Sequence, residues 1–519
     1  MQNVWKSRFY LLTEQLHRLE CVLERESDED INIVISDDSV AFFICKILRK
    51  KGENVDYFKK RFHGIRFGLS SSYQFFRKIW GVFRYLTDLC RWNCFPKIRD
   101  VKGDVILVSV GSDNSLATDP YRDFLLGDLP EDLLQAGFSP VVFIHKLGIS
   151  QGVLAKEHRY QSGLVVCGFG DLCSVWDAIY CIFSALTSKI TIPKLKSLLS
   201  ADLSFLARLD VSQARLSEVA VSIYYECALR RLRALLPNAT IIHSWENQSW
   251  EHACRVVSDK TVATVGVQHN ALLPEHRKMR ADVAKDVPKP MPSVIITSGP
   301  ESTRILVKEF GHKSERLFDG FDVRSGSQEV VWHESNGGFA RRVLVLLQGL
   351  QSQVHFHNAV AYASEVLIGW NFILRAHPAV PIYENLLGSQ LADLVAKMDV
   401  SESTSLIDDI ISCDAVVYSG STAVFRAVSS GVPVVHVESV SPLGNDPLFR
   451  LDHLVRRVNG GAGLVAAIRE IEKSKARDLA VERQFASNYV REYFRPKNDV
   501  VLAEVISKIV DLKGQTKST

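Results

Sequence analysis

The stretch that most constrains the fold lies at residues 414–438, with the sequence DAVVYSGSTAVFRAVSSGVPVVHVE. An apolar run of strand length, 415–418, is followed by a small polar turn and by a short helical pattern at 423–430. Gly431 and Pro433 end that helix before two valines begin another strand. This strand–turn–helix–strand unit predicts a parallel α/β sheet.

The turn of this unit consists of Ser419, Gly420, Ser421 and Thr422, directly before the expected helix. Free backbone N–H groups and the helix dipole favour an anion at such a position, and phosphate is the usual one. The alternative is an ordinary crossover in which a Ser or Thr caps the helix. The unit by itself leaves both interpretations open.

Length and composition set broad limits on the rest of the chain. The 519 residues predict two or more domains, and 46% hydrophobic with 23% charged residues is typical of a soluble globular protein. The net charge of +3 gives no reason to expect nucleic acid as a partner. Ten cysteines without CxxC spacing predict reduced core thiols, with neither a metal site nor a disulfide framework.

No stretch of the sequence predicts a signal peptide or a membrane span. The N-terminus lacks a long apolar core, and the most apolar long window, 175–192, carries Asp177 and Lys189. We therefore expect a cytoplasmic protein, with peripheral contact to the inner membrane as an open alternative.

A basic aromatic segment, residues 49–99, differs from the rest of the chain. It holds thirteen Lys/Arg against three Asp/Glu, a net charge of +10, with twelve aromatic residues interleaved. Phe76, Trp80 and Phe83 have helical spacing. Such a segment can lie on an anionic membrane, here through residues 57–95, or bind an acidic polymer. It can equally be a helix packed on its domain with a solvated basic face.

Two α/β series follow one another along the chain. Strands are expected near 104–110, 141–144, 239–243, 262–267 and 293–297, and again after a polar linker (325–339) near 343–347, 372–374 and 415–418. The region 463–512 has helical patterns. We expect two Rossmann-like domains facing a cleft, over residues 1–315 and 316–519, with helices at the C-terminus.

Four groups of polar residues stand at strand or helix ends in the second half. They are the serine turn, the pair Gln348 and Gly349, the run Arg375, Ala376, His377 and Pro378, and the run Ser403, Thr404 and Ser405. Arg375 is a permanent cation suited to phosphate, and His377 can donate to a phosphate oxygen. Because ligands bind outside the carboxyl ends of parallel strands, these groups predict a nucleotide site.

Two strand ends in the first half carry candidates for a general base. Glu246 and Glu251 follow one strand, and His269 follows the next. A carboxylate at a strand end can deprotonate a hydroxyl, and His269 can act as the base or position an acceptor. Glu251 can instead compensate a helix dipole, Glu246 can be a surface charge and His269 a turn residue. Asp119 and Asp123 are further candidate carboxylates.

The order of these motifs resembles one protein family. EN-Q-x-WE at 246–251, G-x-QH at 266–269, P-x-x-I-x-T-S-G at 292–299, RAHP at 375–378 and the serine turn occur in that sequence. This order is similar to bacterial surface carbohydrate biosynthesis proteins, which are GT-B glycosyltransferases, and more distantly to capsule Kdo transferases and bacterial sialyltransferases. The resemblance implies that His377, Ser419, Ser421 and Thr422 hold the CMP moiety, with Arg375 nearby.

Two features depart from related enzymes. Arg426 stands where many GT-B enzymes have an acid for the ribose, and no acid follows the turn until Glu438. A D/E-D/E-G segment of the sialyltransferase kind is also missing from the sequence.

The resemblance implies a metal-independent GT-B glycosyltransferase of surface polysaccharide synthesis, for lipopolysaccharide O-antigen or capsule. It would transfer a sugar, with a CMP-linked nonulosonate or Kdo-type acid favoured, to a glycan or lipid-linked glycan with inversion. It would use no cofactor apart from its nucleotide-sugar donor. Two alternatives stay open: a polyol-phosphate transferase that uses a CDP-alcohol, and a non-catalytic glycan-assembly protein on a decayed scaffold.

Overall fold

The structure is a computed structural model, and it describes most of the chain beyond the N-terminal quarter. The described residues are 79–87, 94, 98, 101–111, 116, 119–146, 158–159, 162–187, 219–258, 263–274, 276, 279–281, 291–324, 341–347, 354–377, 397–403, 405–438, 444–474 and 476–515.

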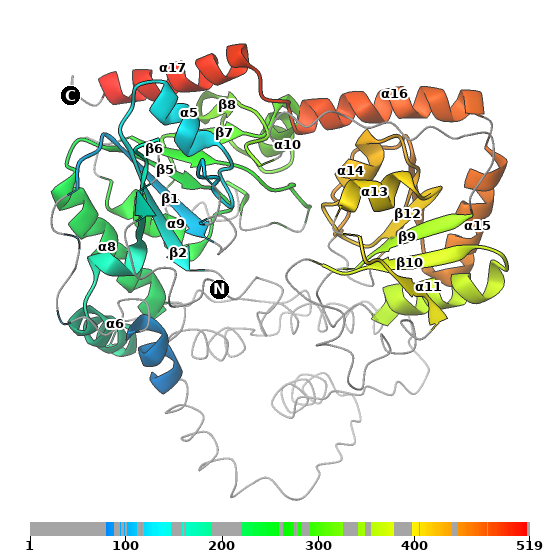
Figure 1. Ribbon diagram of the computed structural model, residues 1–519, viewed down its shortest axis with the longest axis horizontal. Coiled ribbons are helices and arrows are strands. Elements are labelled where there is room, and N and C mark those ends of the chain that lie inside the picture. The colour runs from blue at the N-terminus through cyan, green and yellow to red at the C-terminus, as the bar shows by residue number, and fades with distance from the viewer. Residues whose placement is uncertain are drawn as a thin grey trace, which may run out of the picture. The chain divides into compact units, whose positions relative to one another are not determined.

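The first sheet has eight strands in the order β3-β4-β2-β1-β5-β6-β7-β8 (Figure 1). Strand β1 pairs in parallel with β2 on one side and with β5 on the other, and β5 to β8 continue in parallel. The two-residue strand β3 runs antiparallel to β4. The strands are β1 (Val105–Gly111), β2 (Pro140–Lys146), β3 (His158–Arg159), β4 (Val165–Gly168), β5 (Thr240–Ser244), β6 (Thr264–Val267), β7 (Val294–Thr297) and β8 (Leu317–Asp319).

The second sheet has six strands, all parallel, in the order β11-β10-β9-β12-β13-β14. Counted from its own first strand this is 3-2-1-4-5-6, the order of a doubly wound Rossmann sheet. The first sheet repeats the same order around β1 and β5. The strands are β9 (Arg342–Leu346), β10 (Asn371–Arg375), β11 (Asp399–Val400), β12 (Ala415–Tyr418), β13 (Val434–Val437) and β14 (Val455–Val458).

Helices connect the strands and extend the chain at its C-terminal end. They are α5 (Leu129–Gln135), α6 (Val175–Thr187), α8 (Ala220–Leu235), α9 (Ser249–Val256), α10 (Pro300–Lys308), α11 (Val354–Val366), α13 (Leu406–Ile411), α14 (Val424–Ser429), α15 (Gly460–Lys473), α16 (Ala476–Tyr493) and α17 (Asp499–Gln515), with 3-10 turns η3 (Phe169–Leu172) and η6 (Ser314–Arg316). Residues 79–87 are helical as well.

The apolar runs of the sequence become strands that are buried along their length, as expected for parallel sheets covered on both faces. On one face of the second sheet, α11 and α15 pack in a common core with β9, β10, β12 and β13. On one face of the first sheet, α5 and α17 contribute to the core. The α/β fold class with two Rossmann-like sheets is therefore confirmed.

Helix α17 shows that the end of the chain belongs to the core of the first sheet. Val501, Val505 and Ile509 lie on one face of α17 and are buried in that core. Helix α16, which precedes α17, packs on α14 and on α10. The hydroxyl of Tyr493, at the end of α16, accepts a hydrogen bond from the backbone N–H of Leu272 at 2.6 Å.

The predicted strands lie within two residues of their expected bounds, whereas β3, β4, β8, β11 and β14 were not predicted. The helix after the serine turn is α14, which has six residues instead of the expected eight, with Ala423 as its N-cap and no capping side chain. Strand β6 begins at Thr264, two residues after the predicted start. The predicted linker (325–339) lies outside the described residues, and the division at residue 315 stays a prediction.

Residue contacts divide the chain into two compact units. One contains helix 79–87, α6 and α8, and the other contains both sheets. Within the described residues no helix is long and apolar enough to cross a membrane. Those same residues contain no cluster of His, Cys, Asp and Glu that could hold a metal ion.

Candidate functional site

Each Rossmann-like sheet has a switch point, where neighbouring strands continue in opposite directions across the sheet. In the first sheet it lies between β1 and β5, and in the second between β9 and β12. Ligands of such sheets bind outside the carboxyl ends of the strands at this point. Glu246 follows β5 and the serine turn follows β12, so the two main predicted groups occupy equivalent positions.

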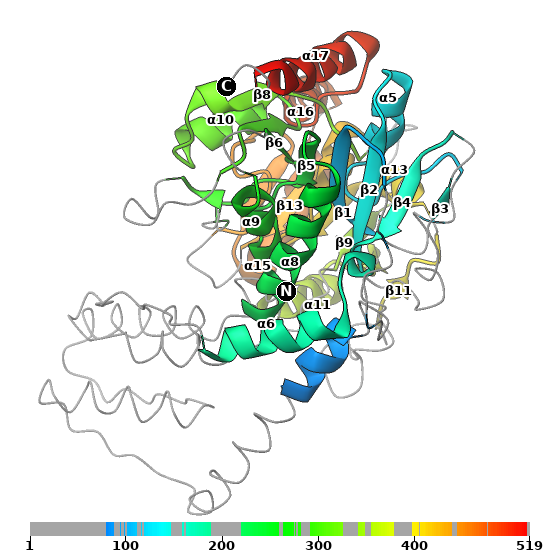
Figure 2. The same cartoon turned by 90° about the vertical axis from the view of Figure 1, so that its left-hand side faces the viewer.

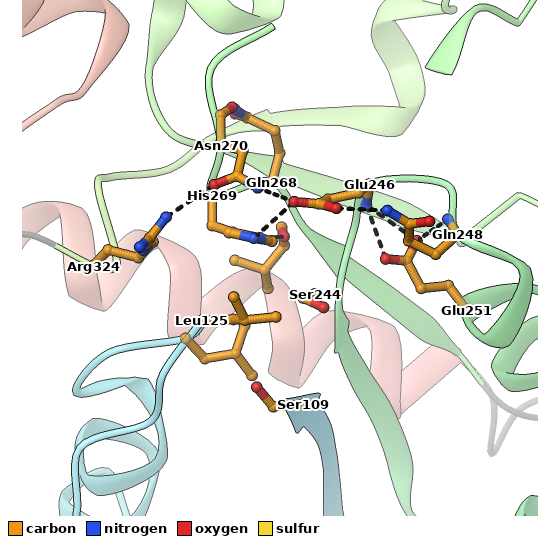
Figure 3. Close-up of polar contacts among 12 residues, drawn as sticks. Ser109, Leu125, Ser244, Glu246, Gln248, Glu251, Gln268, His269, Asn270 and Arg324 are labelled. Carbon is orange, nitrogen blue, oxygen red and sulfur yellow. Dashed lines mark hydrogen bonds and ion pairs between the residues drawn. The ribbon is translucent and has the colours of Figure 1, made fainter. Parts of the chain in front are cut away.

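Glu246 is the centre of a polar cluster at the end of the first sheet (Figure 3). Its Oε2 accepts a hydrogen bond from Nε2 of Gln248 at 2.8 Å, and its Oε1 accepts one from Nδ2 of Asn270. A quarter of the Glu246 side chain is exposed. The carboxylate is therefore held in a fixed orientation and is accessible to a ligand.

His269 lies beneath Glu246, on the loop that follows β6. Its Nε2 is 3.3 Å from Oε1 of Glu246, within ion-pair distance but without the alignment of a hydrogen bond. Its ring is fully buried, and Nδ1 is 3.5 Å from the carbonyl oxygen of Val267. The structure thus brings the predicted pair Glu246 and His269 together, with Glu246 as the more accessible member.

Glu251 has a different environment. It lies in the first turn of α9 and is fully buried. Its carboxylate accepts the backbone N–H of Glu246 at 3.0 and 3.1 Å and that of Gln248 at 3.1 Å. These bonds shape the loop that carries Glu246, so Glu251 supports that loop, and its role as a base stays a prediction.

A second set of residues holds Asn270, one of the two amide partners of Glu246. The backbone N–H of Ser298, after β7, donates to Oε1 of Gln268 at 2.8 Å, and Nε2 of Gln268 donates to the carbonyl of Asn270. Nη1 of Arg324 donates to Oδ1 of Asn270 at 2.9 Å. Since Arg324 fixes the oxygen end of this amide, the nitrogen end faces Glu246 (Figure 3).

Asp123, one of the alternative carboxylates, is buried and has four hydrogen-bond donors. Ser109 Oγ donates to it at 2.5 Å, Tyr121 Oη at 2.8 Å, and two backbone N–H groups at 2.8 Å each. Burial raises the pKa of Asp123, although these four bonds act to lower it. We interpret Asp123 as the structural centre of the loop after β1. The other alternative, Asp119, precedes a cis proline.

The serine turn of the second sheet lies above a buried polar network. Ser419 is buried; its Oγ accepts a hydrogen bond from Nδ2 of Asn445 at 3.2 Å, and its carbonyl oxygen lies 2.9 Å from Nε2 of His436. The same His436 nitrogen is 3.3 Å from Oδ1 of Asn445. Nδ1 of His436 is buried and has no hydrogen-bond partner among the described residues.

Asp446 anchors this network from below. It accepts hydrogen bonds from Tyr418 Oη at 2.7 Å, from the backbone N–H of Leu448 at 2.8 Å and from Nε of Arg457 at 2.8 Å. Burial, together with the neighbouring charge of Asp446, raises the pKa of Tyr418 well above its ordinary value. Ser419 is therefore held by Asn445 and His436, whereas Thr422, at the other end of the turn, is exposed.

Arg375 has a partner that the sequence did not indicate. Its guanidinium forms an ion pair with Asp409 of α13, and Nη1 is 3.3 Å from Oγ of Ser401 and 3.2 Å from the carbonyl of Ser403. Ser405 is the N-cap of α13 and accepts the backbone N–H of Asp408 at 3.3 Å. Asp409 therefore neutralises the charge of Arg375, and Ser405 caps the N-terminus of α13.

His377, two residues beyond Arg375, is exposed at the end of β10, and partial burial of its ring lowers its pKa. Four other residues of the predicted nucleotide site lie outside the described residues: Gln348, Gly349, Pro378 and Thr404. For His377 and these four, a role in binding stays a prediction.

Sequence reasoning did not assign a role to several residues of these clusters. In the first sheet they are Gln248, Asn270 and Arg324, and in the second His436, Asn445 and Asp446. Gln248 belongs to the EN-Q-x-WE motif and Asn270 directly follows G-x-QH, so amides next to a candidate base were a usable signal. Arg324 and Asn445 are separated from their partners by 54 and 26 residues, and only the fold brings them together.

Comparison with known proteins gives structural neighbours only. No protein-family model matches the chain, and no curated protein matches it. Among solved structures, the glycosyltransferase SnogD from Streptomyces nogalater is 17% identical, with 79% of this chain and 99% of that chain covered and a TM-score of 0.42.

Two further neighbours show how wide this similarity is. The calicheamicin glycosyltransferase is 12% identical over 80% of this chain and 99% of its own, with a TM-score of 0.46. The UDP-GlcNAc 2-epimerase from Neisseria meningitidis, bound to UDP-GlcNAc, is 9% identical over 78% of this chain and 100% of its own, with a TM-score of 0.40. At this level of similarity a shared function does not follow.

Proposed function

We propose that this protein is a glycosyltransferase that takes its sugar from a nucleotide-activated donor. The observation that carries the proposal is the position of Glu246, an accessible carboxylate at the switch point of a Rossmann-like sheet, held by Gln248 and Asn270. A fixed carboxylate at a ligand-binding strand end is what deprotonation of a hydroxyl requires.

The reaction uses Glu246 as the general base. The proton of an acceptor hydroxyl passes to the Glu246 carboxylate, and the hydroxyl oxygen bonds to the anomeric carbon of the donor sugar. The bond between that carbon and the nucleotide phosphate oxygen breaks, and the nucleotide leaves with the electron pair. Attack opposite to the leaving group inverts the anomeric configuration. The ring of His269, with Nε2 3.3 Å from Oε1, lies against the carboxylate and limits its movement.

The second sheet is the proposed nucleotide site. The serine turn stands at its switch point, and the buried network of Asn445, His436 and Asp446 keeps Ser419 in place. Because α14 is only six residues long, few peptide dipoles align there, and hydroxyl and backbone N–H groups of the turn carry more of the binding. His377 is the proposed contact to phosphate, since Arg375 is paired with Asp409.

Within this function we propose a CMP-linked donor, a nonulosonate or Kdo-type sugar acid, and an acceptor hydroxyl on a bacterial surface polysaccharide. The support for this narrower proposal is the motif order from EN-Q-x-WE to the serine turn. The absence of an acid between Thr422 and Glu438 supports a donor other than a common UDP-sugar.

Titration of the full chain with CMP, CDP and UDP tests the nucleotide part. We expect CMP to bind with the highest affinity by isothermal titration calorimetry. Binding of none of the three would leave a non-catalytic assembly protein and refute both enzyme proposals. Incubation with CMP-Kdo, a CMP-linked nonulosonate and a CDP-alcohol then separates the reactions, because sugar transfer yields a glycosidic product and the alternative yields a phosphodiester visible by ³¹P NMR.

A further inference from the structure

Helix α6 exposes a stripe of large apolar side chains. Trp176, Tyr180 and Phe183 are 66%, 57% and 65% exposed, and Ile179 and Leu186 are partly exposed beside them. Their spacing of three and four residues places them on one face of the helix. A contiguous exposed face of this kind marks a surface that contacts another apolar phase.

The fold of α6 does not need this stripe. The opposite face, with Ala178, Cys181 and Ile182, is buried, and α6 packs there against α8. The one acidic residue of the helix, Asp177, is paired with Arg231 of α8 through two hydrogen bonds of 2.6 Å each. The stripe is therefore free of negative charge, and the helix is already held in place on its other side.

The neighbouring helix, residues 79–87, carries the same kind of surface. It lies next to α6 in both views (Figures 1 and 2) and belongs to the same compact unit. Trp80 is 60% exposed on it, and Arg84 and Tyr85 are exposed as well. Both helices thus expose aromatic side chains, and helix 79–87 also exposes the cation Arg84.

The sequence on either side of these two helices is basic, which favours an anionic partner. Helix 79–87 belongs to the basic aromatic segment, whose net charge is +10. The sequence after α6 contains Lys189, Lys194 and Lys196, with no acidic residue before Asp202. Each Lys or Arg near an anionic lipid surface contributes about 1 kcal/mol to binding.

We propose that α6 is an interfacial helix that lies in the headgroup region of an anionic membrane, with Trp176, Tyr180 and Phe183 inserted between the lipids. At thirteen residues it is too short to span a bilayer, whereas an aromatic face beside basic side chains suits the interface. Trp and Tyr favour this depth because their rings are apolar and their N–H and O–H groups reach water. This binding does not depend on the proposed enzymatic function.

Co-sedimentation of the full chain with vesicles tests the proposal. We expect binding to vesicles of phosphatidylglycerol and phosphatidylethanolamine, and much weaker binding to vesicles of phosphatidylcholine alone. The triple variant Trp176→Ser, Tyr180→Ser, Phe183→Ser should lose at least about tenfold in affinity for the anionic vesicles. In the parent, nitroxide-labelled lipids should quench tryptophan fluorescence, and the single variant Trp176→Phe should reduce that quenching.

A matched control replaces three exposed apolar residues elsewhere, Ile368→Ser, Val481→Ser and Val500→Ser, which are 90%, 54% and 68% exposed. This control should bind as the parent does, and both triple variants should unfold at the parent's temperature, since no core residue is changed. Equal binding of parent and α6 variant, or no binding by the parent, would overturn the proposal. So would a concentration-dependent dimer without vesicle binding that the α6 variant abolishes, because the stripe would then bind a second copy.

Discussion

The two switch points share a topology but differ in chemistry. At the end of β5 the first sheet carries a carboxylate, Glu246, with amide and imidazole neighbours. At the end of β12 the second sheet carries hydroxyls, and its nearby cation Arg375 is paired with Asp409. The same strand order therefore presents a carboxylate in one sheet and neutral hydroxyls in the other. In the proposed function the first carries out the chemistry and the second binds the nucleotide.

Next to each switch point lies a buried carboxylate that forms its hydrogen bonds with the protein itself. Glu251 orders the loop of Glu246 through backbone N–H groups, and Asp446 supports the serine turn through Tyr418 and Arg457. A buried charge with several donors fixes its surroundings firmly, because breaking any of these bonds leaves a desolvated group unpaired. Glu246 and the serine turn can therefore be tested separately from the buried carboxylates Glu251 and Asp446.

The largest effect is expected for Glu246→Gln. The amide keeps the size of the side chain but cannot take a proton, so turnover should fall about 100-fold or more. Affinity for CMP should stay unchanged, because the nucleotide is assigned to the second sheet. Initial rates and calorimetry measure the two quantities, with the exposed Glu492→Gln as control. Activity close to that of the parent would remove Glu246 as the base.

The variant Asn445→Ala tests the proposed nucleotide-binding role of the serine turn in the second sheet. Loss of the hydrogen bond from Nδ2 to Ser419 Oγ should loosen the turn and weaken CMP binding by about tenfold, which corresponds to ~1.4 kcal/mol. The rate at saturating donor should change less than the affinity. Asn488→Ala on the exposed side of α16 is the control. A lower rate with unchanged affinity would reverse the roles given to the two sheets.

The free energy of unfolding should distinguish the two buried carboxylates, Asp446 and Glu251. Asp446→Asn leaves Arg457 without its buried partner and should lower the free energy of unfolding by about 2–3 kcal/mol, measured by urea denaturation. Glu251→Gln keeps an acceptor for its backbone N–H donors, so a loss of about 1–2 kcal/mol is expected. If Glu251→Gln lowered the free energy of unfolding more than Asp446→Asn does, Glu251 would contribute more to stability than Asp446.

The smallest effect concerns pH and the edge of the second sheet. Burial acts to raise the pKa of Glu482, but the hydrogen bonds from Arg456 and the Leu454 N–H and the charge of Arg456 outweigh it and hold the pKa below its ordinary value. Such a group stabilises the fold above its unfolded-state pKa, and this contribution is lost as pH falls through the lower, folded-state value. Glu482→Gln should therefore flatten the acid side of the stability profile, by at most about 1 kcal/mol. An unchanged profile would show that the pair contributes nothing measurable.

The accuracy of the sequence predictions followed the range of the interactions. The strand after Asp414, the turn and the helix at 424–429 were predictable because apolar runs, glycine and proline act on neighbouring residues. The proximity of Glu246 and His269 was also predictable, since both follow neighbouring parallel strands. By contrast, the partner of Arg375 was not, because Asp409 lies 34 residues away on a different element.

The sequence by itself determined the two parallel sheets and placed candidate residues at their carboxyl ends, because hydrophobic periodicity and turn residues encode local structure. Only the tertiary structure decided which candidates are accessible and which are supports. It showed that Glu251 accepts bonds from the loop backbone, that Asp123 has four donors, that Asp409 balances Arg375, and that Asn445 holds Ser419. The physical reason is that the role of a charge depends on its burial and its partners, and those partners come from distant parts of the chain.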